Sequence, residues 1–255
     1  MGSKGRMNLV IDLGNSYGKI AVCEGMEIIE SAVYPAITIK EIGYFITAYP
    51  SLKGAIFSSV ANHSREIIDF LGGEFNYFLE LNTTTPIPLK NLYKTPETLG
   101  YDRIAAVTGA YTIYPGSNVL VIDAGTAITY DLVTDAGEYL GGSISPGLSM
   151  RFKALHRFTN RLPMVEPGEE KAELIGVSTK QAIASGVING ILFEIEGTIS
   201  AVSEQFKKVK VVMTGGDAKS FDKKVKNSIF VHSHLNLIGL NRILDHNAEI
   251  IHTSH

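Results

Sequence analysis

Leu9-Val-Ile-Asp-Leu-Gly-Asn-Ser-Tyr-Gly-Lys-Ile-Ala-Val22 and Leu120-Val-Ile-Asp-Ala-Gly-Thr-Ala-Ile-Thr-Tyr-Asp-Leu-Val133 are two copies of one sequence pattern. Each copy has the form L-V-I-D-x-G and then continues into a second apolar run. The copies begin almost half a chain apart, which predicts a tandem duplication of one domain topology and not a solenoid of short repeats. We expect an N-terminal half over residues 7–116 and a C-terminal half over residues 117–255.

Both copies predict a β-hairpin, because a buried strand ends in an Asp-x-Gly turn and another strand-like run follows it. A dinucleotide-binding unit would need G-x-G-x-x-G at the start of a helix, and a P-loop would need G-K-S/T. Neither motif is present in the sequence. Elsewhere the sequence predicts alternating strands and helices: strands at 54–60 and 210–213, and helices at 63–71, 103–114, 178–207 and 240–246.

The composition excludes several classes of protein. Hydrophobic residues make up 45% of the 255 residues, and the net charge is −3 with no long basic run, so nothing suggests a nucleic-acid binder. Cys23 is the single cysteine, which excludes a disulfide framework and fits a reducing cytoplasm. No apolar run approaches the roughly 20 residues of a membrane span. We therefore expect a soluble cytoplasmic protein with no membrane partner. We also expect Met7 to be the native start and residues 1–6 to be an added leader.

The first hairpin turn has the chemistry of a phosphate-binding loop. A carboxylate stands at the strand end, small residues follow whose backbone amides can converge on an anion, and a lysine supplies a point charge. The acid can also hold Mg²⁺ through water. The alternative is an ordinary turn that uses Asp and Gly for geometry. The candidate phosphate ligands are Asp12, Leu13, Gly14, Asn15, Ser16, Tyr17, Gly18 and Lys19.

The second turn, Asp123-Ala-Gly-Thr126, repeats this device on the other half of the chain. Two such turns facing each other would surround a triphosphate and its cation, and coincidence would have to occur twice at equivalent positions. Further along, Thr214-Gly-Gly-Asp-Ala218 follows a strand. Its paired glycines let backbone lie against a nucleobase or ribose, although a tight strand-to-helix turn explains them equally well. His232 and His234 alternate on one expected strand face and receive no metal role.

Two helix starts are ambiguous from local sequence. At Gly100-Tyr-Asp-Arg103, Asp102 is either an N-cap beside a surface arginine or a general base for an acceptor hydroxyl, with Arg103 binding an acidic substrate. Thr179 or the preceding Ser178 can cap the long helix. Within that helix, glycines 186, 190 and 197 are expected to allow close packing.

The order of these motifs resembles the type III pantothenate kinase family. Asp-x-Gly-Asn-Ser comes first, then Gly-x-Asp-Arg, Asp-x-Gly-Thr-Ala, Gly141-Gly-Ser-Ile-Ser-Pro-Gly147 and Thr-Gly-Gly-Asp, covering most of residues 9–244. The resemblance implies an α/β fold of two duplicated ribonuclease-H-like domains, as in actin-like ATPases, with mixed sheets flanked by helices and ATP in the cleft between the halves. It also implies ATP-dependent phosphorylation of pantothenate, the first step of coenzyme A biosynthesis.

By the same resemblance, residues 12–19 form the ATP phosphate loop and Asp102 is the proton acceptor. Asp123 matches the ligand of a monovalent cation, K⁺ or NH₄⁺, and Thr126 matches a nucleotide contact. The family often has alanine where Tyr101 stands here, a difference beside the base. The implied pantothenate-binding residues are Tyr93, Gly100, Tyr101, Asp102, Arg103 and Thr179.

The resemblance further implies Mg²⁺ bound with ATP, and a homodimer in which the helix from Ser178 packs against its partner. Two rivals remain. A sugar kinase of the same superfamily would have a neutral acceptor pocket, whereas Arg103 favours an acceptor that carries a carboxylate. A nucleotide-binding regulator without turnover would have lost the phosphate acid or the base, and both Asp12 and Asp102 are present.

Overall fold

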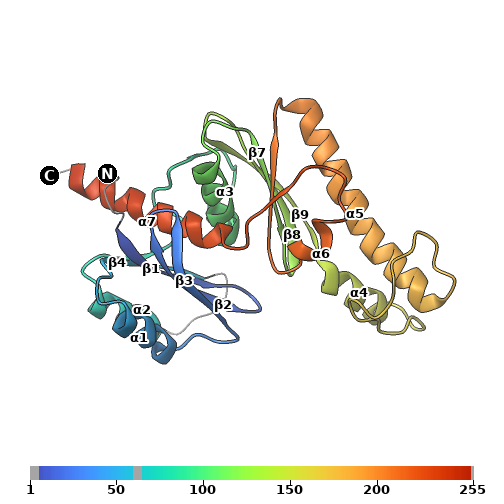
Figure 1. The fold of residues 1–255 in the computed structure, drawn as a ribbon, viewed down its shortest axis with the longest axis horizontal. Helices are drawn as coiled ribbons and strands as arrows, with labels where there is room; N and C mark the ends of the chain where they lie inside the picture. Colours follow the sequence, from blue (N-terminus) through green and yellow to red (C-terminus); the bar gives the residue numbers. More distant parts are fainter. Residues whose placement is uncertain (1–5, 60–64, 254–255) are drawn as a thin grey trace. The chain divides into compact units, whose positions relative to one another are not determined.

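A computed structural model of the chain describes residues 6–59 and 65–253 (Figure 1). The chain divides into two compact units. Unit 1 contains the chain up to Gly116, the segment Val133–Gly141 and the chain from His234 onward; unit 2 contains Ser117–Leu132 and Gly142–Ser233. Residues 117–255, expected to form one half, are therefore shared between both units.

Unit 1 is built on a mixed five-stranded sheet of order β3-β2-β1-β4-β5. The first three strands form an antiparallel meander, whereas β4 and β5 run parallel to β1. The predicted hairpin at the start of the chain is confirmed, and so is the strand predicted from residue 54, as far as the structure describes it. The strands are β1 Met7–Leu13, β2 Gly18–Glu24, β3 Glu27–Tyr34, β4 Gly54–Ser59 and β5 Phe78–Glu80.

Alternation along β1 explains how helices cover this sheet. Leu9 and Ile11 lie in a core cluster with Ile42 of α1 and Leu71 of α2. On the other face Asn8 hydrogen-bonds to Asn241 of α7 at 2.8 Å. The unit 1 helices are α1 Ile39–Ala48, α2 Arg65–Glu74, α3 Tyr101–Ile113, α7 Leu235–Thr253 and a short 3₁₀ turn, Pro96–Thr98. The helix expected over residues 63–71 corresponds to α2, although residues 63–64 lie outside the described residues.

Two glycines join the last helix to unit 1. A Cβ atom on Gly109 of α3 would lie 2.2 Å from the carbonyl oxygen of Leu235, and one on Gly239 of α7 would lie 1.8 Å from that of Ala105. Helices pack this closely only where side chains are absent. The contact between α3 and α7 is the physical reason why the C-terminal segment belongs to unit 1.

Unit 2 contains the second predicted hairpin, β7 Val119–Ala124 and β8 Ala127–Val133. β10 runs parallel to β7 and pairs in turn with β11, while β8 lies next to β9. β9 begins among unit 1 residues, where it pairs with β6, and ends in unit 2. The remaining elements are β6 Lys90–Asn91, β9 Glu138–Pro146, β10 Lys210–Thr214, β11 Phe230–Val231, α4 Leu148–Arg157, α5 Thr179–Gln205 and α6 Ala218–Phe221.

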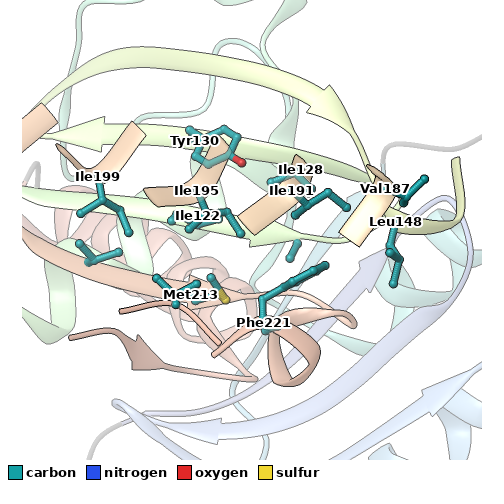
Figure 2. Packing of buried hydrophobic residues seen from close by; sticks show 14 of the residues in the cluster. Ile122, Ile128, Tyr130, Leu148, Val187, Ile191, Ile195, Ile199, Met213 and Phe221 are labelled. Carbon is teal, nitrogen blue, oxygen red and sulfur yellow. The ribbon is translucent and has the colours of Figure 1, made fainter. Parts of the chain in front are cut away.

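The long helix α5 supplies much of the core of unit 2. Figure 2 shows Ile191 and Ile195 directed from α5 toward Ile122 of β7, with Phe221 of α6 in the same cluster. The helix is long and apolar enough to cross a membrane by length and composition, a test that buried core helices also pass. Its residues in this cluster show that one face of α5 is a core face.

Three local expectations can be compared with the structure. Of the two residues expected to cap α5, Ser178 does so, because its side chain accepts a hydrogen bond from Gln181 N at 3.2 Å. Within one copy of the described chain, the α5 glycines make no close contact: nothing lies within 4 Å of a Cβ built on Gly186 or Gly197, and one built on Gly190 would meet only Arg151 Nη1, at 3.9 Å. The two histidines follow β11 and are not part of a strand, since β11 ends at Val231.

Candidate functional site

The first Asp-x-Gly turn lies in unit 1, between β1 and β2. Asp12 is buried with 8% of its surface exposed, and it pairs directly across the hairpin with Lys19. The tip is closed by a hydrogen bond from Gly14 N to Tyr17 O at 3.1 Å, and residues 14–17 are exposed. A buried acid, a facing lysine and an exposed glycine-containing tip are the parts a phosphate-binding loop requires.

A second cluster in unit 1 surrounds Arg103. This arginine is only 5% exposed, which contradicts the interpretation as a surface residue. Its guanidinium carbon lies 5.3 Å from the ring centre of Tyr93, and Tyr93 stacks on Tyr139 at 6.1 Å with an angle of 20° between the rings. Gly141, at φ +99°, leaves room for Tyr93, because a Cβ there would lie 2.9 Å from the ring. The structure thus brings together Tyr93 and Arg103, which the resemblance assigns to one substrate.

The carboxylate of Asp102 occupies space that a side chain on Gly100 would fill. A Cβ built on Gly100 would lie 2.5 Å from Asp102 Oδ1. The same oxygen accepts a hydrogen bond from Arg103 N at 2.8 Å. Gly100 itself is the N-cap of α3, so the interpretation of Asp102 as the N-cap is wrong. Asp102 is instead held in the first turn, where the positive end of the helix dipole stabilises a carboxylate. Tyr101 precedes it and is half-buried.

The second Asp-x-Gly turn is in direct contact with the Thr214–Asp217 turn within unit 2. β7 and β10 are parallel neighbours, so their carboxyl ends meet at one edge of the sheet. There Gly215 adopts φ +96°, and a Cβ on it would lie 2.3 Å from Ala124 O and 2.5 Å from Asp123 Oδ1. Asp217 N donates to Ala124 O at 2.9 Å. Asp123 and the paired glycines therefore belong to one small site.

A third backbone segment closes on this turn from the start of α4. Gly147 N donates to Thr126 O at 3.1 Å. A Cβ on Gly147 would lie 2.2 Å from Gly125 O, so only glycine fits. Thr126 itself is exposed at the tip. The turn that contains Asp123 and Thr126 is consequently fixed from two sides.

Next to these segments, unit 2 holds a cavity of about 510 Å³. Its apolar walls include Leu148, which follows Gly147, and Phe221 of α6. The size falls in the range of small-molecule sites. Polar and charged side chains at its lining suit an organic ligand that has both apolar and polar groups: Glu170, Lys171, Glu173, Asn189, Ser220 and Lys224.

Thr179, the remaining predicted site residue, is the first residue of α5 and is exposed. It belongs to unit 2, whereas Tyr93 and residues 100–103 belong to unit 1. Among the described residues no group of three or more His, Cys, Asp or Glu side chains is placed to hold a metal ion.

The set of predicted site residues missed four positions that the structure places in these clusters: Tyr139, Gly147, Gly215 and Asp217. Burial raises the pKa of the Asp217 carboxyl. The motifs Gly141–Gly147 and Thr214–Ala218 are visible in the sequence and were the available signal for three of them. Tyr139 has no such signal, because its stacking on Tyr93 joins segments far apart in the chain.

Comparison with known proteins gives a consistent result. A family model described as type III pantothenate kinase matches residues 8–201. The type III pantothenate kinase of Christiangramia forsetii is 45% identical over 242 residues, covering 94% of this chain and 99% of that protein. The corresponding enzyme of Phocaeicola vulgatus is 44% identical over 246 residues, covering 96% of this chain and 100% of that protein.

Solved structures support the fold. A protein described as a Baf family transcriptional activator from Campylobacter jejuni matches with a TM-score of 0.63 at 23% identity, covering 94% of this chain and 99% of that one. A protein described as an N-acetylmannosamine kinase from Listeria monocytogenes matches with a TM-score of 0.53 at 12% identity, covering 94% and 99%. The expected α/β fold, with mixed sheets flanked by helices, is confirmed.

Proposed function

Because the chain belongs to the type III pantothenate kinase family, we propose that it transfers the γ-phosphoryl group of ATP to the terminal hydroxyl of pantothenate, in the first step of coenzyme A biosynthesis. The observation that carries the proposal is the cluster around Arg103. A buried guanidinium stacked on Tyr93, next to the carboxylate of Asp102, combines a binder for a substrate carboxylate with a base for a substrate hydroxyl.

In this reaction Asp102 orients the hydroxyl of pantothenate and accepts its proton. The freed oxygen forms a bond to the γ-phosphorus, and the bond from that phosphorus to the bridging oxygen of ADP breaks. Phosphoryl transfer leaves the protein little covalent chemistry to do, so alignment and charge neutralisation supply most of the catalysis. Lys19, opposite Asp12 in the first turn, neutralises phosphate charge from the protein side.

Residues 12–19 and Thr126 are assigned to ATP, and Tyr93, Gly100–Arg103 and Thr179 are assigned to pantothenate. Asp123 fits a monovalent cation, K⁺ or NH₄⁺, because its carboxylate oxygen and the carbonyl oxygen of Ala124 both border the space beside Gly215, and a cation of this kind takes oxygen ligands. Mg²⁺ would be held with the triphosphate, near Asp12. Both ions supply positive charge against the phosphates. We place the enzyme in the cytoplasm.

We also infer a homodimer. The face of α5 opposite the core presents the exposed residues Ala182, Gly186, Phe193 and Gly197 at helical spacing. Phe193 is 59% exposed. An exposed apolar side chain between small residues on the outer face of a core helix is a surface that a second copy can cover.

The test of the function is ATP consumption with pantothenate, pantetheine and a set of hexoses, each in sodium and in potassium buffer. We expect turnover with pantothenate that depends on potassium, and none with hexoses. Turnover with a hexose, or equal rates in purified sodium and potassium buffers, would contradict the substrate or the cation assignment respectively.

The sharper test of the acceptor is Arg103→Lys. A lysine reproduces the guanidinium only as a point charge, so KM for pantothenate should rise far more than KM for ATP, with kcat/KM falling roughly 10-fold to 100-fold. Pantetheine lacks the carboxylate, so it should be a poor acceptor and almost indifferent to the substitution. Measuring both acceptors with both proteins gives a double-mutant cycle. Equal losses for the two acceptors would show that Arg103 does not bind the carboxylate.

A further inference from the structure

One carboxylate in unit 2 connects three elements that flank the second Asp-x-Gly turn. Glu194 of α5 accepts a hydrogen bond from the Tyr130 hydroxyl of β8 at 2.8 Å through Oε1. Its other oxygen, Oε2, accepts from Arg151 Nη2 of α4 at 2.5 Å. Figure 2 shows Tyr130 on the sheet face that α5 covers. Glu194 thereby ties α5 to the strand that leaves the turn and to the helix that closes on it.

Arg151 continues the connection toward the turn. Its Nη2 also donates to Ser145 Oγ at 2.7 Å, and its Nε donates to Pro146 O at 2.8 Å. The next residue is Gly147, whose N–H donates to Thr126 O and whose Cα lies against Gly125. Glu194 is therefore connected to Thr126 by the hydrogen bonds of Arg151, the peptide bond between Pro146 and Gly147, and the hydrogen bond from Gly147 N.

The pair is only partly open to water, since the side chains of Arg151 and Glu194 are 20% and 30% exposed. Burial acts to raise the pKa of Glu194, but the hydrogen bonds from Arg151, Ser145 and Tyr130 together lower it below its ordinary value. The carboxylate is thus ionised at neutral pH. A charged, hydrogen-bonded group in such surroundings holds its partners in a narrow range of positions.

We propose that Arg151 and Glu194 are positioning residues for the turn Asp123–Thr126, and that they set how tightly the enzyme binds its nucleotide and monovalent cation. They do so through Ser145–Gly147, without touching either ligand. The proposal rests on the assignment of Asp123 and Thr126 in the proposed function. The hydrogen bonds of the pair lead to the second Asp-x-Gly turn within unit 2, whereas Asp102 belongs to unit 1, so the constants for the acceptor should change least.

The experiment compares Arg151→Met, Arg151→Lys and Glu194→Gln with the parent enzyme. Arg151→Met removes all the hydrogen bonds to Ser145, Pro146 and Glu194. It should raise KM for ATP, Kd for ADP and the potassium concentration for half-activation roughly tenfold, as loss of charged hydrogen bonds does. KM for pantothenate should change less than about twofold. Arg151→Lys keeps the charge and should recover part of the loss, and Glu194→Gln, which keeps the shape, should be intermediate.

The matched control is Arg242→Met, which removes an arginine–glutamate pair on α7 with hydrogen bonds of 2.8 and 3.2 Å to Glu249. It should leave all four constants unchanged. If the Arg151 variants lower only the melting temperature, or raise the pantothenate and ATP constants equally, the pair is merely structural and the proposal is wrong.

ADP binding, measured by calorimetry in sodium and in potassium, separates this proposal from the proposed function. If the parent enzyme fails to phosphorylate pantothenate but its potassium-dependent ADP binding is weakened by Arg151→Met, the function is wrong and the positioning role stands. If the parent phosphorylates pantothenate but ADP binds equally well to the parent and to all three variants, the function stands and the positioning role is wrong.

Discussion

At the scale of single residues, glycines decide where the reacting groups lie. Gly100 leaves the space that the carboxylate of Asp102 occupies, and Gly141 leaves the space for the ring of Tyr93. The local sequence left Asp102 between a helix cap and a base, and the resemblance to the kinase family made it the candidate base. It could not show that Arg103 is buried, since the rings of Tyr93 and Tyr139 come from segments far apart in the chain.

The first prediction concerns Asp102. Asp102→Asn preserves the size of the side chain but removes the group that accepts the hydroxyl proton, so kcat should fall by about 10² to 10⁴. ADP binding and the melting temperature should stay near those of the parent. Glu97→Gln, an exposed acid just before the same helix, serves as the control and should keep normal kcat. A near-normal kcat for Asp102→Asn would leave Asp102 as a carboxylate that only stabilises the helix start.

At the scale of elements, the sequence predicted both hairpins, because in each copy a buried run ends at Asp-x-Gly and a second strand-like run follows it. It also predicted α5 closely, because the apolar residues of this helix repeat every three to four positions. The contact between α3 and α7 was not predictable. It depends on two glycines about 130 residues apart that face each other only once the chain has folded.

The second prediction tests this helix contact. Gly239→Ala places a methyl group against the backbone of Ala105, where nothing flexible can move aside. Overpacking of this kind should cost about 2 kcal/mol or more in the free energy of unfolding, measured by urea denaturation. Gly72→Ala in α2 has nothing within 4 Å of the new methyl group. It should stabilise the protein by up to ~1 kcal/mol through helix propensity alone. Equal effects of the two substitutions would contradict the close packing.

The third prediction concerns the pH dependence of α7. Burial raises the pKa of Asp245, and the hydrogen bond from Asn8 and the charges of Arg242 and Arg6 offset this only in part. A carboxyl whose pKa is higher in the folded state favours folding below its unfolded pKa, and this stability is lost as the pH rises through the folded pKa.

Asp245→Asn removes that titration, while its carbonyl oxygen can still accept from Asn8. The difference in melting temperature, variant minus parent, should therefore be more positive at pH 8 than at pH 4. Asp69→Asn, on the exposed surface of α2, is the control and should show no such difference. A difference that is equal at both pH values would mean that the carboxyl does not titrate abnormally.

At the scale of the whole molecule, the repeat predicted two domains of one topology, and both hairpins are present at the centres of separate units. The path of the chain between the units lay beyond prediction. β9 leaves unit 1 for unit 2 in mid-strand, and the chain returns to unit 1 for its last helix. Hydrophobic periodicity identifies each element but carries no information on which unit that element joins.

The fourth prediction concerns the assembly. Phe193→Glu places a charge on the exposed strip of α5, which should convert the inferred dimer into a monomer of 27.7 kDa, measured by analytical ultracentrifugation. Tyr44→Glu, at a residue of α1 that is 60% exposed, is the matched control and should leave the mass in solution unchanged. If the parent protein already sediments as a monomer, or Phe193→Glu remains a dimer, another surface or no surface joins two copies.

The closing of unit 1 by α7 also has a consequence for protein synthesis. A ribosome releases the N-terminus first, and at roughly 5–20 residues per second the chain beyond Gly116 takes on the order of ten seconds to emerge. During that time the faces of α3 and β1 that α7 later covers are exposed to solvent, and the hydrogen bond from Asn8 to Asn241 cannot form. Unit 1 therefore starts to fold first and completes its fold last, so the nascent chain should depend on chaperones until α7 has emerged. Loss of the last twenty residues should therefore destabilise the protein more than a long extension at its N-terminus.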